Sequence, residues 1–426
     1  MIRLRPLTLG ALIVALLLLV LYTAAFIAFP RAMGKDFLLD FDVFYLVSEM
    51  NAEGSLYRAY VPELFLERQA SPLWPNSPKM YWSYPPPFNF VIAPLSLVAA
   101  PLSYALFMIA TGAFAVLVLR RLSGEGFHTV AILFCPMALL IIKSGQNSFL
   151  TGGLVGLACL LAMQSSRWAG LPLGLMAIKP HLALGVGIWS LLTRRWGLAA
   201  LSLGTVTAIS GLATLAFGPG IWPASLGGIA DTAEVLEGGG FAYYRMTSIY
   251  ASARSLGIGH DMAMALHLAA AILALASLAW VVARGPAAGL VLGYAVVVST
   301  LLSPYNYDYD LAMLAAAAGL LLPALARHAG AVEKGVLIGT VLLASYYGMI
   351  VTEFYDTILG EEAYLAHPPV SLVGPVMIIA ACLLLRILQR ARDAGEESLP
   401  EALDRVDRPG RGPRSGPARG EPSLQA

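Results

Sequence analysis

The sequence predicts an all-α polytopic membrane protein, and three observations lead to this fold class. Of the 426 residues, 58% are hydrophobic and only 12% are charged, and the mean hydropathy is +0.72. Soluble domains carry roughly twice that share of charged residues, so this chain cannot cover its surface with polar groups. Long apolar segments recur along the chain, and the basic residues cluster in every second connection between them. Both patterns are typical of membrane-spanning helices.

The apolar segments number twelve, and we expect each to form a helix that crosses or enters the membrane. Several are shorter than the ~20 residues that cross hydrocarbon unaided, but such helices are stable where protein surrounds their ends. The first segment is too long for a signal-peptide core and has no small-residue cleavage site, so it is predicted to be a retained span. The segments are Leu9–Phe29, Ser103–Leu119, Val130–Ile142, Phe149–Met163, Trp168–Ile178, Leu182–Leu192, Trp196–Phe217, Ala263–Val282, Ala287–Leu302, Leu311–Leu325, Val336–Ile350 and Val370–Leu388.

The distribution of basic residues predicts the orientation. With a cytoplasmic N-terminus, all basic clusters fall on the cytoplasmic side, as the positive-inside rule requires. The opposite connections hold nearly all acids and aromatics outside the C-terminal tail. The apolar stretch Phe88–Ala100 is only about half a span, and counting it as a crossing would reverse every later connection. We therefore predict that it is a half-membrane or interfacial helix and that both termini are cytoplasmic.

The predicted domain organisation is simple. Residues 1–390 form one membrane domain, in which residues 30–102 are a long first outer loop with short amphipathic helices. Residues 391–426 are rich in Arg, Glu, Gly and Pro and poor in apolar residues, which is typical of a disordered tail. We see no internal repeat of fixed period.

Charge and cysteine content exclude several classes of function. The formal net charge of +1, from 27 Lys and Arg against 26 Asp and Glu, excludes a nucleic-acid binder, which needs a basic face. The three cysteines, Cys135, Cys159 and Cys382, lie in apolar stretches and are predicted to be packed thiols. No Cys or His spacing indicates a metal or redox site. We therefore expect no cofactor, while metal dependence stays open.

Polar residues at membrane ends are the informative ones, because hydrocarbon penalises polar side chains. Three acids, Asp36, Asp40 and Asp42, follow the first span within seven residues. They form either a solvated acidic patch or a general base held at the boundary of water and lipid. Asp40 and Asp42 are two positions apart, so on a helix they diverge and cannot both face one substrate.

Two further outer ends carry amides and bases. Gln146 and Asn147 either cap a helix or bind sugar hydroxyls, since an amide offers a donor and an acceptor together. Lys179 either extends its amine toward water or, together with His181, holds a lipid phosphate.

The outer connection Ser303–Asp310 is both aromatic and acidic. An aromatic belt at the membrane interface explains its tyrosines but not Asp308 and Asp310. His367, before two prolines, is more typical of a surface loop than of a catalytic site. Together the outer ends offer acids, amides, a lysine and stacking aromatics at headgroup depth, which suits a lipid-linked sugar.

Several of these motifs together resemble glycosyltransferase family 87. They are Asp40–Tyr45, Gly54–Tyr57, Tyr84–Phe88 with Ala93–Leu95, Gly145–Asn147, Lys179–His181 and Ser303-Pro304, in the order that the family shows. These are polytopic enzymes of the GT-C class, and they include bacterial α-mannosyltransferases that use polyprenyl-phosphate mannose. The resemblance covers about Leu9 to Leu388.

The resemblance implies a GT-C fold with about twelve membrane helices and an inverting transfer of a hexose, with mannose the family's best-known sugar. The donor would be a polyprenyl-phosphate sugar and the acceptor a lipid or glycan. Enzyme and substrates would meet on the extracytoplasmic side of a bacterial inner membrane. The chain has no nucleotide-sugar motif, which agrees with a lipid-linked donor.

The resemblance also implies roles for single residues. The catalytic aspartate heads an Asp-apolar-x-Val-aromatic motif, which places it at Asp40, with Asp42 as second choice. For the donor phosphate we expect Lys179, His181 and Arg245. For the sugar and the acceptor we expect Tyr45, Tyr84, Gln146, Asn147, Tyr305, Asp308 and His367.

The main alternative is a transporter or flippase of lipid-linked saccharides, which also needs about twelve spans and an amphiphilic cavity. Transporters usually show internal repeats and polar residues near the membrane midplane. Here the polar residues cluster at one face, which favours the enzyme over the transporter. A noncatalytic assembly subunit is a third reading, which no specific feature favours.

Overall fold

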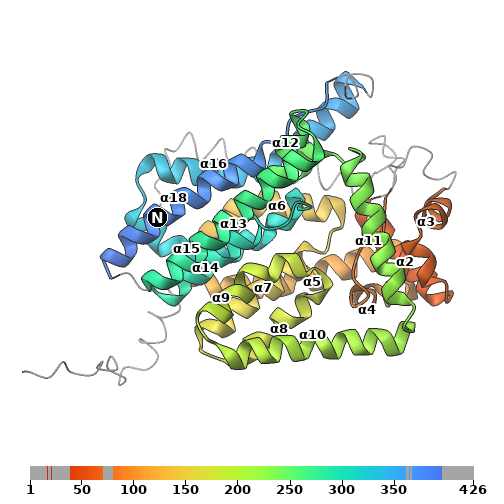
Figure 1. The fold of residues 1–426 in the computed structure, drawn as a ribbon, viewed down its shortest axis with the longest axis horizontal. Coiled ribbons are helices and arrows are strands. Elements are labelled where there is room, and N and C mark those ends of the chain that lie inside the picture. Colours follow the sequence, from red (N-terminus) through yellow and green to blue (C-terminus); the bar gives the residue numbers. More distant parts are fainter. Residues whose placement is uncertain are drawn as a thin grey trace, which may run out of the picture.

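The computed structural model describes residues 39–70, 80–360, 364 and 367–395, together with residues 17 and 21. Within these ranges every regular element is a helix, and the only β-type contact is an isolated bridge between Met246 and Tyr307. The predicted all-α class is therefore confirmed for the described part of the chain (Figure 1).

Six helical stretches in the described ranges are long and apolar enough to cross a membrane. This confirms the membrane class, whereas the number twelve stays a prediction. The predicted first span Leu9–Phe29 lies outside the described residues, apart from residues 17 and 21. The six are Ala100–Ser144, Trp196–Phe217 (α10), His260–Arg284 (α13), Asp308–His328 (η8 and α15), Ala331–Phe354 (α16) and Val373–Asp393 (α18).

The stretch Ala100–Ser144 contains two helices, as the two predicted segments within it require. Helix α5 (Ala100–Ser123) ends at Gly124, whose φ of +50° breaks the helix, and α6 (Phe127–Ser144) follows after one 3₁₀ turn. A side chain is disfavoured at such a positive φ, and glycine is not. Both helices pack on α7 (Ser148–Met163) and α15 (Leu314–His328).

Four further apolar helices are shorter than these six stretches. They are α7, α8 (Gly170–Leu175), α9 (Leu184–Leu192) and α14 (Ala288–Ser299). Every residue from Gly289 to Ser299 in α14 is buried, so this helix is surrounded by protein over its length. The enclosure of α14 agrees with the expectation that short helices need protein around their ends.

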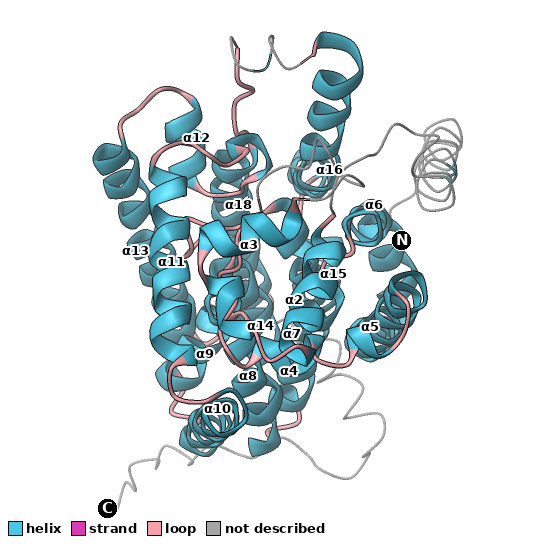
Figure 2. Ribbon diagram, turned by 90° about the vertical axis from the view of Figure 1, so that its right-hand side faces the viewer, coloured by secondary structure: helices cyan, strands magenta, loops and turns pink. Residues whose placement is uncertain are grey.

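The predicted first outer loop is folded over residues 39–70 and 80–102 and lies at one end of the bundle. It contains α2 (Asp40–Ala52), α3 (Pro62–Gln69) and α4 (Phe88–Ile92). Figure 2 shows α2 and α3 at this end together with α11 (Ile221–Glu237). The segment thus contains short helices, whereas their extracytoplasmic position stays a prediction. Helix α2 is not a surface helix, however, because Phe41, Phe44 and Val47 are at most 3% exposed.

The connection after α10 holds two helices that the sequence did not predict, α11 (Ile221–Glu237) and α12 (Ile249–Ser255). The buried face of α11 is built from Ile221, Ser225, Gly228, Thr232 and Leu236. These residues repeat with helical spacing, but three of them are small or polar. The apolar residues of the helix are separated by two glycines, Asp231 and Glu234, so they form no continuous apolar run in the sequence.

Candidate active site

The candidate site lies where five distant connections of the chain meet. Asp40 begins α2, and Gln146 lies in the turn between α6 and α7. Lys179 lies between two 3₁₀ turns, Arg245 ends η7 (Tyr243–Arg245), and Asp308 begins η8 (Asp308–Met313). The sequence predicts all five connections on the same side of the membrane, and in the structure they converge.

A close glycine contact brings the α6–α7 turn to the beginning of α2. Gly145 has a φ of +71°, and a β-carbon there would lie 2.4 Å from the Cβ of Phe41. No other residue type allows this approach, because real Cβ contacts are never that short and the backbone conformation disfavours side chains. The contact places Gln146 beside Asp40, whose carboxylate it hydrogen bonds.

The carboxylate of Asp40 has an unusual proton affinity. Burial raises its pKa to about 6, against the opposing effects of the Arg245 charge, the hydrogen bond from Gln146 and the Lys179 charge. The side chain nevertheless stays partly accessible. A carboxylate of this kind is ionised at neutral pH and is more basic than an ordinary aspartate, as a general base requires.

Asp42 has a different role in the structure. Its Oδ2 accepts the backbone N–H of Leu39 at 2.8 Å, so it caps the first turn of α2. The two aspartates therefore diverge, as their spacing predicts.

Lys179 is buried, forms an ion pair and lies against two aromatic rings. Its Nζ lies 2.5 Å from Oδ1 of Asp310, and it stands over the rings of Tyr84 and Tyr309 at 5.7 and 5.3 Å from their centroids. Only 9% of the residue is exposed. Lys179 therefore does not extend its amine into water.

Arg245 forms a two-pronged ion pair with Asp308. Its Nε donates to Oδ2 at 3.1 Å and its Nη2 to Oδ1 at 3.0 Å, and Asp308 is 1% exposed. The guanidinium also lies 5.7 Å from the ring centroids of Tyr307 and Tyr309. The charges of Arg245, Lys179 and Asp308 thus all act on Asp40, and Asp310 joins the group through its ion pair with Lys179.

Several buried polar atoms near these charges have no hydrogen-bond partner in the described part of the chain. They include the hydroxyl of Ser148 and both amide atoms of Asn147, whose side chain lies beside the Tyr84 hydroxyl. Nε2 of His181 and Oδ1 of Asn306 lie within reach of each other. Unsatisfied buried groups are rare in native proteins and call for an explanation.

Tyr84 and His181 also face this region. The hydroxyl of Tyr84 donates to Oε1 of Gln146 at 3.3 Å. Burial lowers the pKa of His181 to about 4, so its ring is neutral at pH 7. His181 therefore offers hydrogen bonds to a ligand and adds no positive charge for a phosphate.

An aromatic wall borders the charged group. Tyr305 lies edge-on to Phe241, with ring centroids 5.3 Å apart, and to Tyr307 at 5.5 Å. Tyr307 stacks on Tyr309 at 5.4 Å. Aromatic faces of this kind commonly pack against the apolar faces of sugar rings.

Two residues expected at the site have other partners. The hydroxyl of Tyr45 donates to the carbonyl of Val98 at 3.1 Å, which ties α2 to the loop before α5. His367 is exposed, and its carbonyl accepts the hydroxyl of Tyr355 at 2.7 Å. Conversely, Asp310 was not among the expected site residues, although its pairing with Lys179 places it there.

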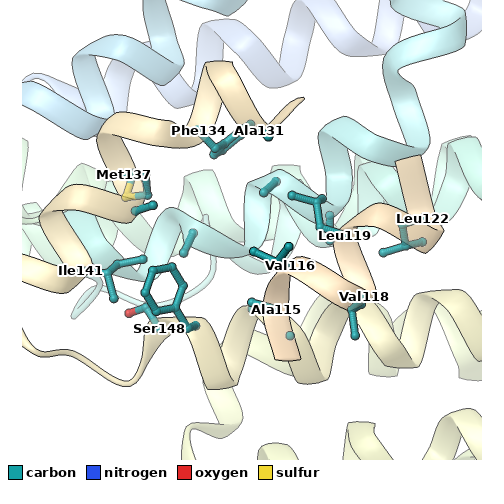
Figure 3. A pocket seen from close by; sticks show the side chains of 18 of the residues that line it. Ala115, Val116, Val118, Leu119, Leu122, Ala131, Phe134, Met137, Ile141 and Ser148 are labelled. Atoms are coloured by element: carbon teal, nitrogen blue, oxygen red, sulfur yellow. The ribbon is translucent and has the colours of Figure 1, made fainter. Parts of the chain in front are cut away.

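An apolar cavity begins beside the polar group. It has a volume of about 150 Å³ and lies between α5, α6, α7 and the first turns of the η8–α15 segment. In Figure 3, Ser148 and Ile141 stand at one end and Leu122 at the other. Ser148 directly follows Asn147, while the remaining lining is apolar or glycine. One of the lining residues, Val116, is 51% exposed.

The described residues contain no cluster of three or more His, Cys, Asp or Glu that could hold a metal ion. The carboxylates near Asp40 are instead paired with Lys179 and Arg245.

A comparison with protein-family models decides the family. The model for glycosyltransferase family 87 matches residues 82–304, slightly more than half of the chain. The chain belongs to glycosyltransferase family 87. The matched range includes Tyr84, Gln146, Lys179 and Arg245, while Asp40 and Asp308 lie outside it. No curated protein and no solved structure matches the chain. Family and fold together make this protein a membrane glycosyltransferase.

Proposed function

We propose that this glycosyltransferase moves a hexose, with mannose as the first candidate, from a polyprenyl-phosphate donor to a lipid or glycan acceptor. The transfer takes place on the extracytoplasmic side and inverts the anomeric carbon. One observation carries the proposal: a carboxylate of raised pKa, Asp40, adjoins two cations in a cluster that borders an apolar cavity.

Asp40 is the proposed general base. The acceptor hydroxyl gives its proton to the carboxylate as its oxygen attacks the anomeric carbon. The bond between that carbon and the phosphate oxygen breaks, and the bonding electrons stay on the phosphate. A single positioned base contributes about 10²–10⁴-fold in rate.

Lys179 and Arg245 are the proposed partners of the departing phosphate. Negative charge grows on the phosphate as the bond breaks, and fixed positive charge in a buried site stabilises it. Among the groups expected at the phosphate, His181 is neutral at pH 7 and contributes hydrogen bonds only.

The sugar is held by amides and rings. Gln146, Asn147 and Tyr84 offer donors and acceptors to its hydroxyls, and both amide atoms of Asn147 are unpartnered. Tyr305 supplies an aromatic face. A sugar in this position would satisfy polar atoms that otherwise cost free energy.

The apolar cavity is the proposed place for the first carrier carbons after the phosphate. Apart from Ser148 its lining presents hydrocarbon and glycine, and exposed Val116 at its rim lies on a helix long enough to cross a membrane. A hydrocarbon chain can therefore enter from the lipid and leave its phosphate at the charged cluster.

The proposal is tested by incubating the purified protein in lipid nanodiscs with polyprenyl-phosphate mannose and membrane lipids of the host. Mass spectrometry should find a product that is heavier by one hexose, with release of polyprenyl phosphate. Parallel reactions with GDP-mannose and UDP-glucose should give no product in the absence of the lipid carrier. Turnover of a nucleotide sugar, or none with any polyprenyl-phosphate hexose, would contradict the proposal.

A further inference from the structure

The two cations of the site are already paired before any substrate binds. Lys179 pairs with Asp310 and Arg245 with Asp308, and both aspartates belong to one 3₁₀ turn, η8. The lysine and the arginine come from separate connections of the chain. One short turn therefore determines where both positive charges stand.

The orientation of both carboxylates is fixed by backbone groups of the same turn. Oδ2 of Asp310 accepts the N–H of Tyr307 at 3.3 Å, and Oδ1 of Asp308 accepts the N–H of Tyr309 at 2.9 Å. The side chains of Asp308 and Asp310 are only 2% and 3% exposed. Neither aspartate can move its cation without breaking a bond to the turn.

Helix α16 closes over the arginine pair through a glycine. A β-carbon at Gly348 would lie 2.3 Å from Oδ2 of Asp308 and 3.2 Å from Cγ of Arg245. The absence of a side chain at this position lets α16 pack directly against the ion pair.

We propose that Asp308 and Asp310 are positioning residues, which hold Arg245 and Lys179 at the two points where charge develops on the departing phosphate. This inference rests on the function proposed above. It gives Asp310 a role in the site. For Asp308 it replaces the contact with sugar or acceptor that the sequence analysis expected. Neither aspartate takes or gives a proton in the reaction.

The two pairs differ in a way that an experiment can use. Burial favours the neutral amine of Lys179, but the Asp310 carboxylate together with Tyr84 and Asp40 outweighs it and raises the pKa of the lysine. Loss of Asp310 lets Lys179 release its proton at lower pH. Arginine stays protonated at all working pH values, so loss of Asp308 displaces Arg245 without discharging it.

The groups that face Lys179 are few and come from four segments. They are Asp310 and Tyr309 of η8, Tyr84 before α4, Asp40 of α2 and the neutral ring of His181. Only the removal of Asp310 takes away a directly bonded negative charge.

The test measures kcat and KM of the wild type, Asp310→Asn and Asp308→Asn against pH, in nanodiscs with polyprenyl-phosphate mannose. Both variants should lose about 10-fold or more in kcat, since small misplacements of a catalytic group cost that much. In Asp310→Asn the alkaline limb of the kcat profile should move to lower pH, whereas in Asp308→Asn it should stay in place. The matched control is Glu333→Gln, which breaks a similar two-pronged pair with Arg390 and should lower the melting temperature with kcat unchanged.

Two outcomes would overturn this inference and leave the proposed function intact. One is an alkaline limb at the same pH in wild type and Asp310→Asn; the other is an unchanged kcat in both variants of an active enzyme. Where Asp310→Asn does not fold, Asp310→Glu carries the test. The added methylene displaces the lysine but keeps the charge, so kcat should fall while the limb stays, and wild-type kcat would contradict the inference. A wild type inactive with every polyprenyl-phosphate hexose would instead overturn the proposed function, and this inference with it.

Discussion

Gly145 packs against Phe41 so closely that a β-carbon at position 145 would lie 2.4 Å from the Cβ of Phe41. The contact joins the α6–α7 turn to the beginning of α2, and it places Gln146 at the carboxylate of Asp40. The position of the Asp40 carboxylate therefore depends on the lack of a side chain at Gly145, which directly precedes its hydrogen-bond partner Gln146.

Gly145→Ala should abolish most of the turnover, because the new methyl group pushes the turn away from α2. Part of the effect is backbone strain of about 1–2 kcal/mol at positive φ. Gly54→Ala is the matched control, since Gly54 has a φ of +72° but nothing within 4 Å of its Cβ position. Melting temperature and kcat of both variants check the prediction. Equal turnover in the two would show that the contact with Phe41 is unimportant.

The proposed base predicts the acidic side of the pH profile. Since burial raises the pKa of Asp40 to about 6, its ionised form is lost as the pH falls through that value. The kcat/KM of the free enzyme should therefore rise with pH through about 6 and level off above it. A profile still flat at pH 5 would mean that the essential base has an ordinary aspartate pKa.

The apolar cavity predicts a dependence on the length of the carrier. Ala315→Leu fills part of the cavity, so the KM for a long-chain polyprenyl-phosphate sugar should rise several-fold. Turnover of a donor whose phosphate carries only one or two carbons, too few to fill the cavity, should change little. If the KM for both donors rose equally, the variant would be disturbing the polar site and not the hydrocarbon chain.

The predicted orientation can be tested by cysteine labelling in intact cells, after removal of the three native cysteines. Single cysteines at Tyr57 and Tyr305 should react with an impermeant reagent from outside. Cysteines at Arg120 and Arg194 should react only after the membrane is opened. Labelling of position 305 from the cytoplasm alone would overturn the proposed side of the active site.

The sequence predicted those parts of the fold that hydropathy controls. All eleven predicted segments in the described ranges overlap helical elements, although Trp168–Ile178 is divided into two 3₁₀ turns and the short helix α8. The overlap arises because a buried or lipid-facing helix needs an apolar run. Helix α11 was missed, since Asp231, Glu234 and two glycines interrupt its apolar residues. A helix without a continuous apolar run is not found by hydropathy.

The candidate site could be predicted as a set of connections but not as a set of contacts. The outer connections pointed to Asp40, Gln146, Lys179 and Asp308, which the structure brings together. Pairing is a property of tertiary structure, so nothing in the sequence linked Lys179 to Asp310. Tyr45 was expected to contact the substrate. In the structure its hydroxyl donates a hydrogen bond to the carbonyl of Val98, a tertiary contact that the sequence does not reveal.

Removal of the Asp40 carboxylate should also change the stability of the protein. The folded protein raises the pKa of Asp40 above the unfolded value of 3.8, so the ionised form costs stability at pH above about 6. That cost is relieved as the pH falls through the folded pKa. Asp40→Asn should therefore melt at the same or a higher temperature at pH 7.5, and a large fall would indicate a structural role for the carboxylate.

The central claim is that Asp40 is the general base, and the most direct measurement compares kcat of Asp40→Asn and Asp42→Asn in nanodiscs with a polyprenyl-phosphate hexose. Both proteins must first elute as monodisperse species and bind the donor. The account predicts a loss of about 10²-fold or more for Asp40→Asn. It predicts a smaller loss for Asp42→Asn, which removes a helix cap. Near-normal turnover of folded Asp40→Asn, with Asp42→Asn inactive, would contradict it.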